Sequence, residues 1–436
     1  MLKRLLNSFI KEPADRERAG IIWNIIGSTV YALTGILLGF LVMRMLGADA
    51  GGIFLFAFST LGQHIFIVAY FGMRPAQVTD TEYRYSYGEY RMMRILTCAA
   101  AVLFGLVFAL IYAGDDPLKK TVIIYMVIYR TLDGWADLSE SEMQREGRLY
   151  LTGRCLTARM LFSVICFVIA MAVTKSLPVS CSVLCAAMAA GAVLNEMTVR
   201  KLPMLDTRVI RTSVRELFKS GSFIFAATFL DLYIFAASKY AVDAMLPASI
   251  SGLYATLFIP TMAITLASGY IIRPALTELS GYRDSHNRKG FVSLTVKITA
   301  VIAGLTVIAV ILGYTIGTQV LSLLVDAATG AEIVNYKTEF ALIMGGGGIY
   351  ALIYLLYYVL IILRKQKEVF VIYAVGTAAA WILSYRMVGA MGVRGGALSY
   401  LICVLAEAAA FAAVTVKTVR DFGWKPAVRL RSFRSP

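Results

Sequence analysis

Ionisable side chains inside otherwise apolar stretches are the residues of this sequence that could do chemistry. Arg130 is followed by Asp133, Asp137 and Glu140 at spacings that place all four on one stripe of a helix. A charge at the centre of a bilayer costs roughly 2.5 to 3.5 kcal/mol on insertion scales, so such a stripe must face water or polar partners. The stripe predicts that Arg130 holds an anionic headgroup, with Asp133 and Asp137 as further candidates for substrate binding; the alternative is internal ion pairing, for example between Arg130 and Asp133.

Four further polar residues are candidates for binding. Asp231 and Glu407 each lie in the middle of a long apolar block, where a carboxyl group could bind a proton or sodium ion that biases a conformational change. His64 could contact a substrate, although a hydrogen-bonded core histidine fits the same pattern. Arg44 follows the first apolar block and is a candidate substrate contact, although its long side chain could simply reach the membrane interface.

The residues that most enzymes need are scarce. The sequence has two histidines, and it has no glycine-rich loop of the Walker type. Its cysteines lie in or beside apolar blocks, where cysteine behaves as a small hydrophobic residue. Cys181 and Cys185 share a helical face but have no other metal ligands nearby. We therefore expect no cofactor, no metal and no enzymatic activity, with a membrane-embedded polysaccharide polymerase or acyltransferase as the remote alternative.

Composition indicates which elements carry these residues. Hydrophobic residues make up 59% of the 436-residue chain and charged residues only 16%, which exceeds the apolar share of soluble domains. They fall in about twelve blocks, most of them close to the length of a transmembrane helix. These blocks lie at 20–43, 52–73, 93–113, 121–135, 155–174, 178–197, 221–242, 249–272, 291–314, 339–363, 369–385 and 396–416. The sequence predicts an all-α polytopic membrane protein.

The cations are distributed in a way that predicts the topology. Most of the 42 Lys and Arg residues fall in alternate connections between the blocks, which is the positive-inside pattern of a multi-pass protein with both termini in the cytoplasm. The net charge of +15 therefore indicates contact with anionic membrane lipids and not with nucleic acid. The beginning of the sequence shows no cleavage pattern, so we expect no removable signal peptide and predict location in the cell (inner) membrane.

An internal repeat is the main sign of domain organisation. Residues 45–54 and 245–254 match at four identical positions, and the Arg-Pro-Ala sequence at 74–76 recurs at 273–275. Six helices in each half would give two lobes related by a parallel pseudo-two-fold axis, which is the plan of rocking-lobe transporters with a central cleft.

The repeat also predicts the domain boundaries. We place the N-lobe at 20–199 and the C-lobe at 221–418, flanked by a cytoplasmic segment, 1–19, and a basic tail, 419–436. The connector at 200–220 is either a helix on the inner leaflet or a solvated linker. Within the C-lobe, the four glycines of 345–348 predict a bend, a close helix contact or a hinge.

Three short segments resemble a known family. Asn24 and Gly27, the stretch 44–52 and the stretch 391–400 are similar to bacterial polysaccharide repeat-unit (O-antigen type) flippases of the multidrug/oligosaccharidyl-lipid/polysaccharide exporter superfamily. The resemblance extends over essentially the whole chain in length and helix count, but its motifs are short and mark fold more than substrate.

The resemblance implies a function and partners. It implies that two lobes flip an undecaprenyl-pyrophosphate-linked oligosaccharide from the inner to the outer leaflet by alternating access, often coupled to H⁺ or Na⁺. The implied partners are the lipid-linked glycan, membrane lipids and polysaccharide assembly enzymes. The alternative is a multidrug or organic-cation exporter of the same superfamily, in which Asp231 and Glu407 would be the central residues. Sequence indicates no oligomeric state.

Overall fold

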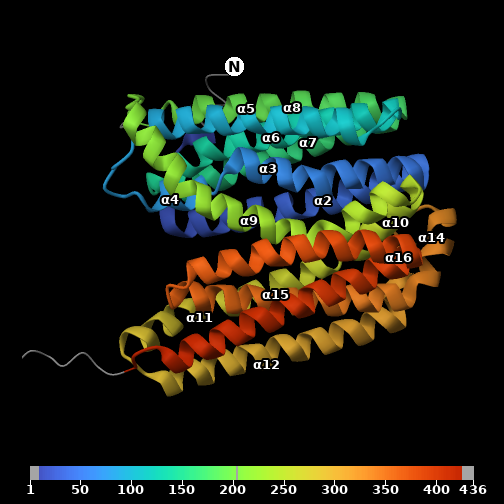
Figure 1. Cartoon of the computed structure of the whole chain (residues 1–436). Helices are drawn as coiled ribbons and strands as arrows, with labels where there is room; N and C mark the ends of the chain where they lie inside the picture. Colours follow the sequence, from blue (N-terminus) through green and yellow to red (C-terminus); the bar gives the residue numbers. More distant parts are fainter. Residues whose placement is uncertain (1–8, 203–204, 425–436) are drawn as a thin grey trace, which may run out of the picture. The chain divides into compact units, whose positions relative to one another are not determined.

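The fold is all-helical throughout the part of the chain that the structure describes. A computed structural model describes residues 9–202 and 205–424, and its regular elements are all helices (Figure 1). Nine of these helical stretches have the length and hydropathy to cross a membrane. The predicted class, an all-α polytopic membrane protein, is confirmed.

The helices of the first half of the chain are α2 (Arg16–Leu55), η1 (Phe56–Leu61), α3 (Gly62–Tyr70), α4 (Met73–Thr79), α5 (Tyr87–Tyr112), α6 (Pro117–Arg145), α7 (Leu149–Thr174) and α8 (Leu177–Val199). Those of the second half are α9 (Arg211–Met245), α10 (Ala248–Phe258), α11 (Thr261–Asp284), α12 (Arg288–Leu312), η2 (Gly313–Gly317), α13 (Thr318–Ser322), α14 (Ala327–Ile333), η3 (Val334–Tyr336), α15 (Lys337–Ile362) and α16 (Gln366–Asp421).

Two of the long helices are broken by glycine. Gly47 has a φ of 83° inside α2, and Gly392 has a φ of 58° inside α16. Glycine adopts positive φ without the steric penalty that a Cβ imposes, so each helix is divided into two crossings at that residue. With these divisions and with α6 counted, the described helices give about twelve crossings, the number that the apolar blocks predict.

The chain divides by its internal contacts into two compact units. Unit 1 comprises the chain up to Ala255 together with Ser322–Ala331, and unit 2 comprises Thr256–Leu321 together with the chain from Glu332. The lobe boundary at 200–220 stays a prediction, and residues 211–220 of that connector form the first turns of α9. Residues 1–8, 203–204 and 425–436, from the predicted N-terminal segment, connector and tail, lie outside the described residues.

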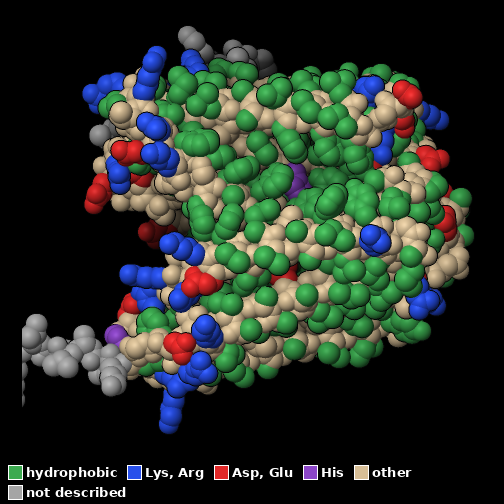
Figure 2. Space-filling view, in the orientation of Figure 1, with side chains coloured by type: hydrophobic (Ala, Val, Ile, Leu, Met, Phe, Trp, Pro, Cys, Tyr) green, Lys and Arg blue, Asp and Glu red, His purple; other side chains and the backbone are tan. Residues whose placement is uncertain are grey.

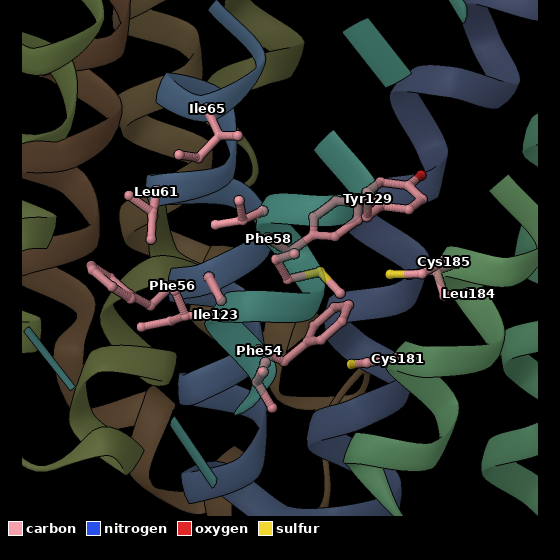
Figure 3. Close-up of a cluster of buried hydrophobic side chains, with 14 of the residues drawn as sticks. Phe54, Phe56, Phe58, Leu61, Ile65, Ile123, Tyr129, Cys181, Leu184 and Cys185 are labelled. Atoms are coloured by element: carbon pink, nitrogen blue, oxygen red, sulfur yellow. The ribbon is translucent and has the colours of Figure 1, made fainter. Parts of the chain in front are cut away.

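Within unit 1, the helices pack around α6. It contacts α3, α4, α5, α7 and α8, while α2 packs along α7. One end of this interior is filled by a cluster of buried apolar side chains that includes Phe54, Phe56, Phe58, Ile123 and Tyr129 (Figure 3). The phenylalanines come from the end of α2 and from the π-helix η1, whose wider turn changes the direction in which successive side chains point.

Within unit 2, glycines allow α15 to pack closely on its neighbours. A Cβ on Gly346 would lie 2.4 Å from the Tyr400 ring, and a Cβ on Gly348 would lie 2.1 Å from the side chain of Thr306. Small residues are enriched at helix contacts in membranes because they let backbones approach. Since α15 continues as an α-helix through 345–348, close helix contact is the role that the structure gives to this tract.

Large apolar side chains also cover the outside of both units. Leu103 and Ile111 on α5, Val173 on α7 and Val307 on α12 are among those that are more than half exposed. On each unit such side chains cover the middle of the helices, and charged side chains gather at the helix ends (Figure 2). This distribution is that of a protein whose helices face lipid along their length and water at their ends.

Candidate functional site

The polar stripe of α6 lies inside unit 1. The helix begins after Asp116, whose side chain accepts a hydrogen bond from the backbone of Lys119, and Pro117 occupies its first turn. Arg130, Asp133, Asp137 and Glu140 are all buried. The stripe therefore faces the bundle interior, one of the two environments that a charged stripe at membrane depth requires.

Arg159 of α7 pairs with two carboxylates of this stripe. Its Nη1 lies 2.5 Å from Asp133 Oδ1, and its Nε lies 2.7 Å from Glu140 Oε1. Asn195 of α8 donates a further hydrogen bond to Glu140 Oε1 at 2.9 Å. Two carboxylates thus share one guanidinium, so the three helices α6, α7 and α8 are connected by charged hydrogen bonds.

Arg130 forms an ion pair within its own helix. Its Nη1 lies 3.4 Å from Asp133 Oδ2, and its Nη2 donates to the carbonyl oxygen of Phe58 at 3.0 Å. The guanidinium carbon also lies 4.3 Å from the centroid of the Phe58 ring. Phe58 belongs to the π-helix η1. These contacts are those of the ion-pair alternative, and a role for Arg130 toward a substrate stays a prediction.

Asp137 of the stripe pairs with two more arginines. Arg74 of α4 reaches Asp137 Oδ1 at 2.6 Å, and Arg94 of α5 reaches Asp137 Oδ2 at 3.0 Å. Their burial differs, because the Arg94 side chain is 0% exposed and the Arg74 side chain is 26% exposed. Of these two arginines, Arg74 is therefore the one that is accessible from outside the unit.

We call these seven residues the arginine cluster: Arg74, Arg94, Arg130, Arg159, Asp133, Asp137 and Glu140. Four guanidinium groups and three carboxylates leave the arginine cluster with a net positive charge if all are ionised. Guanidinium groups match the geometry of phosphate and carboxylate oxygens. The arrangement is suited to holding an anion and offers no activated nucleophile, so the chemistry it supports is binding.

Sequence reasoning missed Arg74, Arg94 and Arg159 as members of this site. By hydropathy all three belong to the cation-rich ends of the blocks, which the topology prediction assigns to cytoplasmic connections. The helices α5 (Tyr87–Tyr112) and α7 (Leu149–Thr174) begin several residues before the apolar blocks at 93–113 and 155–174. An arginine within an apolar block, as Arg94 and Arg159 both are, is the signal that could have found part of the cluster.

The other predicted site residues lie in different places. His64 on α3 is buried, and a Cβ on Gly62, two residues earlier, would lie 3.1 Å from Arg130 Nε. Asp231 on α9 is half-buried, and Arg44 on α2 is exposed. Glu407 is buried on α16 of unit 2. The structure thus brings Arg130, Asp133 and Asp137 together with His64 nearby, and the ion-coupling roles of Asp231 and Glu407 stay predictions.

The first pair of matching stretches in the internal repeat, 45–54 and 245–254, also shares a structural feature. The helix break at Gly47 corresponds to the break between α9 and α10, which falls between Met245 and Ala248. The two segments also touch within unit 1, because a Cβ on Gly252 would lie 2.6 Å from the Cα of Gly52. Two glycines at equivalent repeat positions therefore let the two turns approach to backbone contact.

Polar bonds hold the same contact together. Asp49 Oδ1 accepts a hydrogen bond from the backbone N–H of Ser249, the second residue of α10, at 3.0 Å. Beside it, Asp243 of α9 is buried with its Oδ2 2.6 Å from Lys119 Nζ and its Oδ1 2.8 Å from the Ser251 hydroxyl. An ion pair and a helix cap therefore fasten α9 and α10 to the helices of the first repeat.

The helix breaks near the repeated Arg-Pro-Ala sequence differ between 74–76 and 273–275. Arg74 and Pro75 lie in α4, which follows a break at Phe71 and Gly72 where both residues have positive φ. Pro274 lies inside the continuous helix α11, and the break that precedes it falls at Ile259 and Pro260. The sequence similarity at 74–76 and 273–275 therefore does not extend to equivalent helix breaks.

Solved structures provide the comparison with known proteins, since no protein-family model and no curated protein matches this sequence. An inward-facing multidrug resistance MATE family transporter of the MOP superfamily is 9% identical, with 94% of this chain and 100% of that chain covered and a TM-score of 0.63. The lipid II flippase MurJ is 12% identical over 92% of this chain and 89% of that one, also with a TM-score of 0.63. The chain shares the fold of these transporters.

A third structure extends this likeness. The MATE transporter VcmN of Vibrio cholerae is 12% identical, with 95% of this chain and 98% of that chain covered and a TM-score of 0.59. At such low identity the likeness concerns the fold alone. It leaves the substrate to be argued from this chain's own residues.

Proposed function

We propose that this protein flips a polyprenyl-phosphate- or polyprenyl-pyrophosphate-linked oligosaccharide from the inner to the outer leaflet of the cell membrane by alternating access. The observation that carries the proposal is the arginine cluster of unit 1, which has more guanidinium groups than carboxylates and reaches the surface of the unit at Arg74. A phosphate would be bound by bidentate hydrogen bonds from such a group.

The three carboxylates of the arginine cluster argue against a cationic cargo. Asp133 and Glu140 are bound by Arg159, and Asp137 is bound by Arg74 and Arg94. Carboxylates that are already paired offer little attraction to an organic cation. The lipid II flippase MurJ, which has a lipid-linked cargo by name, is among the structures with this fold.

A multidrug exporter is the second candidate, because MATE transporters, some of them named for multidrug resistance, are among the similar structures. That function would depend on Asp231 and Glu407, which lie outside the arginine cluster. Under either function we propose that the protein sits in the inner membrane with both termini in the cytoplasm. Under the first, polysaccharide assembly enzymes would supply and use its cargo.

The deciding experiment compares two arginines of unit 1 in reconstituted vesicles. Arg74→Gln removes the exposed cation of the cluster while Asp137 keeps Arg94 at 3.0 Å, so the variant should fold. Arg91→Gln is the matched control, because Arg91 lies on α5 outside the cluster and its side chain is 36% exposed. The probe is a fluorescent polyprenyl-pyrophosphate disaccharide, quenched from outside by an impermeant reductant.

We expect wild type and Arg91→Gln to flip the probe, and Arg74→Gln to flip it at least tenfold more slowly, which corresponds to an activation free energy higher by about 1.4 kcal/mol or more. Equal rates for both variants would remove the arginine cluster from substrate binding. No flipping by wild type, combined with accumulation of a cationic dye in the same vesicles, would replace the flippase with the multidrug exporter.

A further inference from the structure

His64 connects two helices that belong to different predicted repeats. It lies on α3 and is 1% exposed. Its Nδ1 lies 2.9 Å from the Tyr240 hydroxyl on α9 and 3.1 Å from the carbonyl oxygen of Thr60 in η1. All of these residues are in unit 1, so the imidazole is a hydrogen-bonded tie between the second and seventh predicted crossings.

The partners of Nδ1 determine which nitrogen of the ring carries hydrogen. The Thr60 carbonyl oxygen can only accept, so we assign the hydrogen to Nδ1, and the Tyr240 hydroxyl then accepts from the same N–H. Nε2 is then the basic nitrogen. Within the part of the chain that the structure describes, Nε2 is buried with no hydrogen-bond partner. His64 therefore holds a basic, unpartnered nitrogen in the interior of the bundle.

Aromatic rings and cations surround this nitrogen. The rings of Phe229 and Tyr233 on α9 lie with centroids 5.0 and 6.2 Å from that of the imidazole, and both meet it edge-on. Lys239 on α9 acts electrostatically on the imidazole, and on α6 the guanidinium of Arg130 lies against Gly62. An imidazolium formed here would lie near these cations. Its Nε2–H would face aromatic rings and would lack a hydrogen-bond acceptor in the described part of the chain.

One more charged residue, Arg94, contacts α3. On α5, Arg94 donates to the carbonyl oxygen of Ala69 at the other end of α3. Phe104 of α5 joins the aromatic group through Phe229, with centroids 6.3 Å apart. On α6, Asp133 pairs with Arg130 and Asp137 pairs with Arg94. The lack of an acceptor beside Nε2 among the described residues is therefore the main feature that disfavours an imidazolium in this conformation.

We propose that Nε2 of His64 is the binding site for the proton that drives transport. The inference rests on the proposed function and names its coupling ion. Imidazole is the side chain whose ordinary pKa allows it to change charge between about pH 5 and 8. A proton from water adds to Nε2 and gives imidazolium, Nδ1 keeps its hydrogen, and the same proton leaves from Nε2 when the cycle is completed.

Protonation changes which conformation is favoured. The charged ring is stable where Nε2–H can bind water, which requires α3 and α9 to separate, whereas the neutral ring is stable in the closed, aromatic environment described above. The His64–Tyr240 hydrogen bond is the contact that this separation breaks. Proton binding would thus favour an open arrangement of the second and seventh crossings, and release would restore the closed one.

The first test observes the proton itself. The chain has two histidines, so His286→Asn leaves His64 as the only one, and asparagine tolerates the positive φ of 58° at that position. The variant is labelled with ¹⁵N-histidine, placed in lipid bilayers and followed by solid-state NMR. Between about pH 8 and 4 we expect Nδ1 to stay protonated and Nε2 to change from bare to protonated. An Nε2 that is protonated at pH 8, or bare at every pH, would overturn the assignment.

The second test measures coupling in vesicles with an imposed pH gradient. Wild type and Tyr240→Phe, which keeps the imidazole, should flip the pyrophosphate disaccharide faster with the gradient than without it. His64→Gln should show no difference between the two conditions. A gradient effect that survives in His64→Gln would overturn the proposal while leaving the flippase intact. Failure of wild type to flip the probe would overturn the proposed function, and with it the role of His64 in coupling, while the NMR titration would still report on proton binding at Nε2.

Discussion

Unit 1 packs four arginines and three carboxylates against one another, whereas the acidic or basic side chain buried among the described side chains of unit 2 is Glu407. Unit 2 instead brings α15 against its neighbours through Gly346, Gly347 and Gly348. Lipid tails are as apolar as leucine, so helices in a membrane need either polar bonds or close packing to associate. Unit 1 combines both, since Gly52 and Gly252 also let two of its turns approach closely, whereas unit 2 associates mainly by close packing.

This difference bears on which unit can bind a charged headgroup. Ion pairs inside a membrane protein require partners placed within a few ångströms, and removing one partner leaves an unpaired charge. Glycine packing involves no charge and requires only shape. The unit with the arginine cluster is therefore the one in which a phosphate could compete for existing hydrogen-bond donors, and unit 2 is expected to tolerate polar substitution better than unit 1.

The largest effect is expected at the centre of the arginine cluster. Arg159→Ala would leave Asp133 and Glu140 without the guanidinium at 2.5 and 2.7 Å, so we expect the free energy of unfolding to fall by about 3 to 5 kcal/mol. Unfolding in mixed detergent micelles measures this. Arg200→Ala is the control, because the Arg200 side chain is 61% exposed and its pair with Glu196 should contribute about 1 kcal/mol or less. Equal losses would show that burial does not increase the contribution of these ion pairs to the free energy of unfolding.

An intermediate effect is expected in the glycine packing of unit 2. Gly348→Ala would place a Cβ 2.1 Å from the Thr306 side chain, and we expect about 1 to 3 kcal/mol of destabilisation from overpacking. Gly345→Ala is matched in type and helix but meets only Val310 at 3.7 Å. It should be neutral or stabilising by up to about 1 kcal/mol, because alanine is the better helix former. The same micelle unfolding compares them, and two equally destabilised variants would contradict the packing argument.

The smallest effect is expected at Glu407. Glu407→Gln keeps the shape and the hydrogen-bonding capacity of a side chain that is 3% exposed and removes only a possible charge, so stability should change by about 1 kcal/mol or less. Thermal unfolding of Glu407→Gln beside Arg159→Ala gives the comparison. If Glu407→Gln were as damaging as Arg159→Ala, unit 2 would also depend on buried charge, and the contrast between the units would be lost.

Sequence patterns determined the fold class and the direction in which the critical side chains point. Hydropathy located about twelve crossings at the expected length of a membrane span. The spacing of Arg130, Asp133, Asp137 and Glu140 placed them on one helical face, and they do share one. The matching stretches 45–54 and 245–254 both contain a helix break in the structure. These features follow from local periodicity and composition, which each helix carries by itself.

Tertiary structure alone decided what those faces meet. The fourth apolar block ends at residue 135, yet α6 continues to Arg145, because its charges are paired by arginines of α4, α5 and α7 that hydropathy counts as connections. In the same way, sequence placed His64 in an apolar helix, and only the packing of α3 against α9 brought Tyr240 to its Nδ1. Periodicity specifies which side of a helix is polar, but the partner comes from another helix whose position depends on the packing of the whole unit.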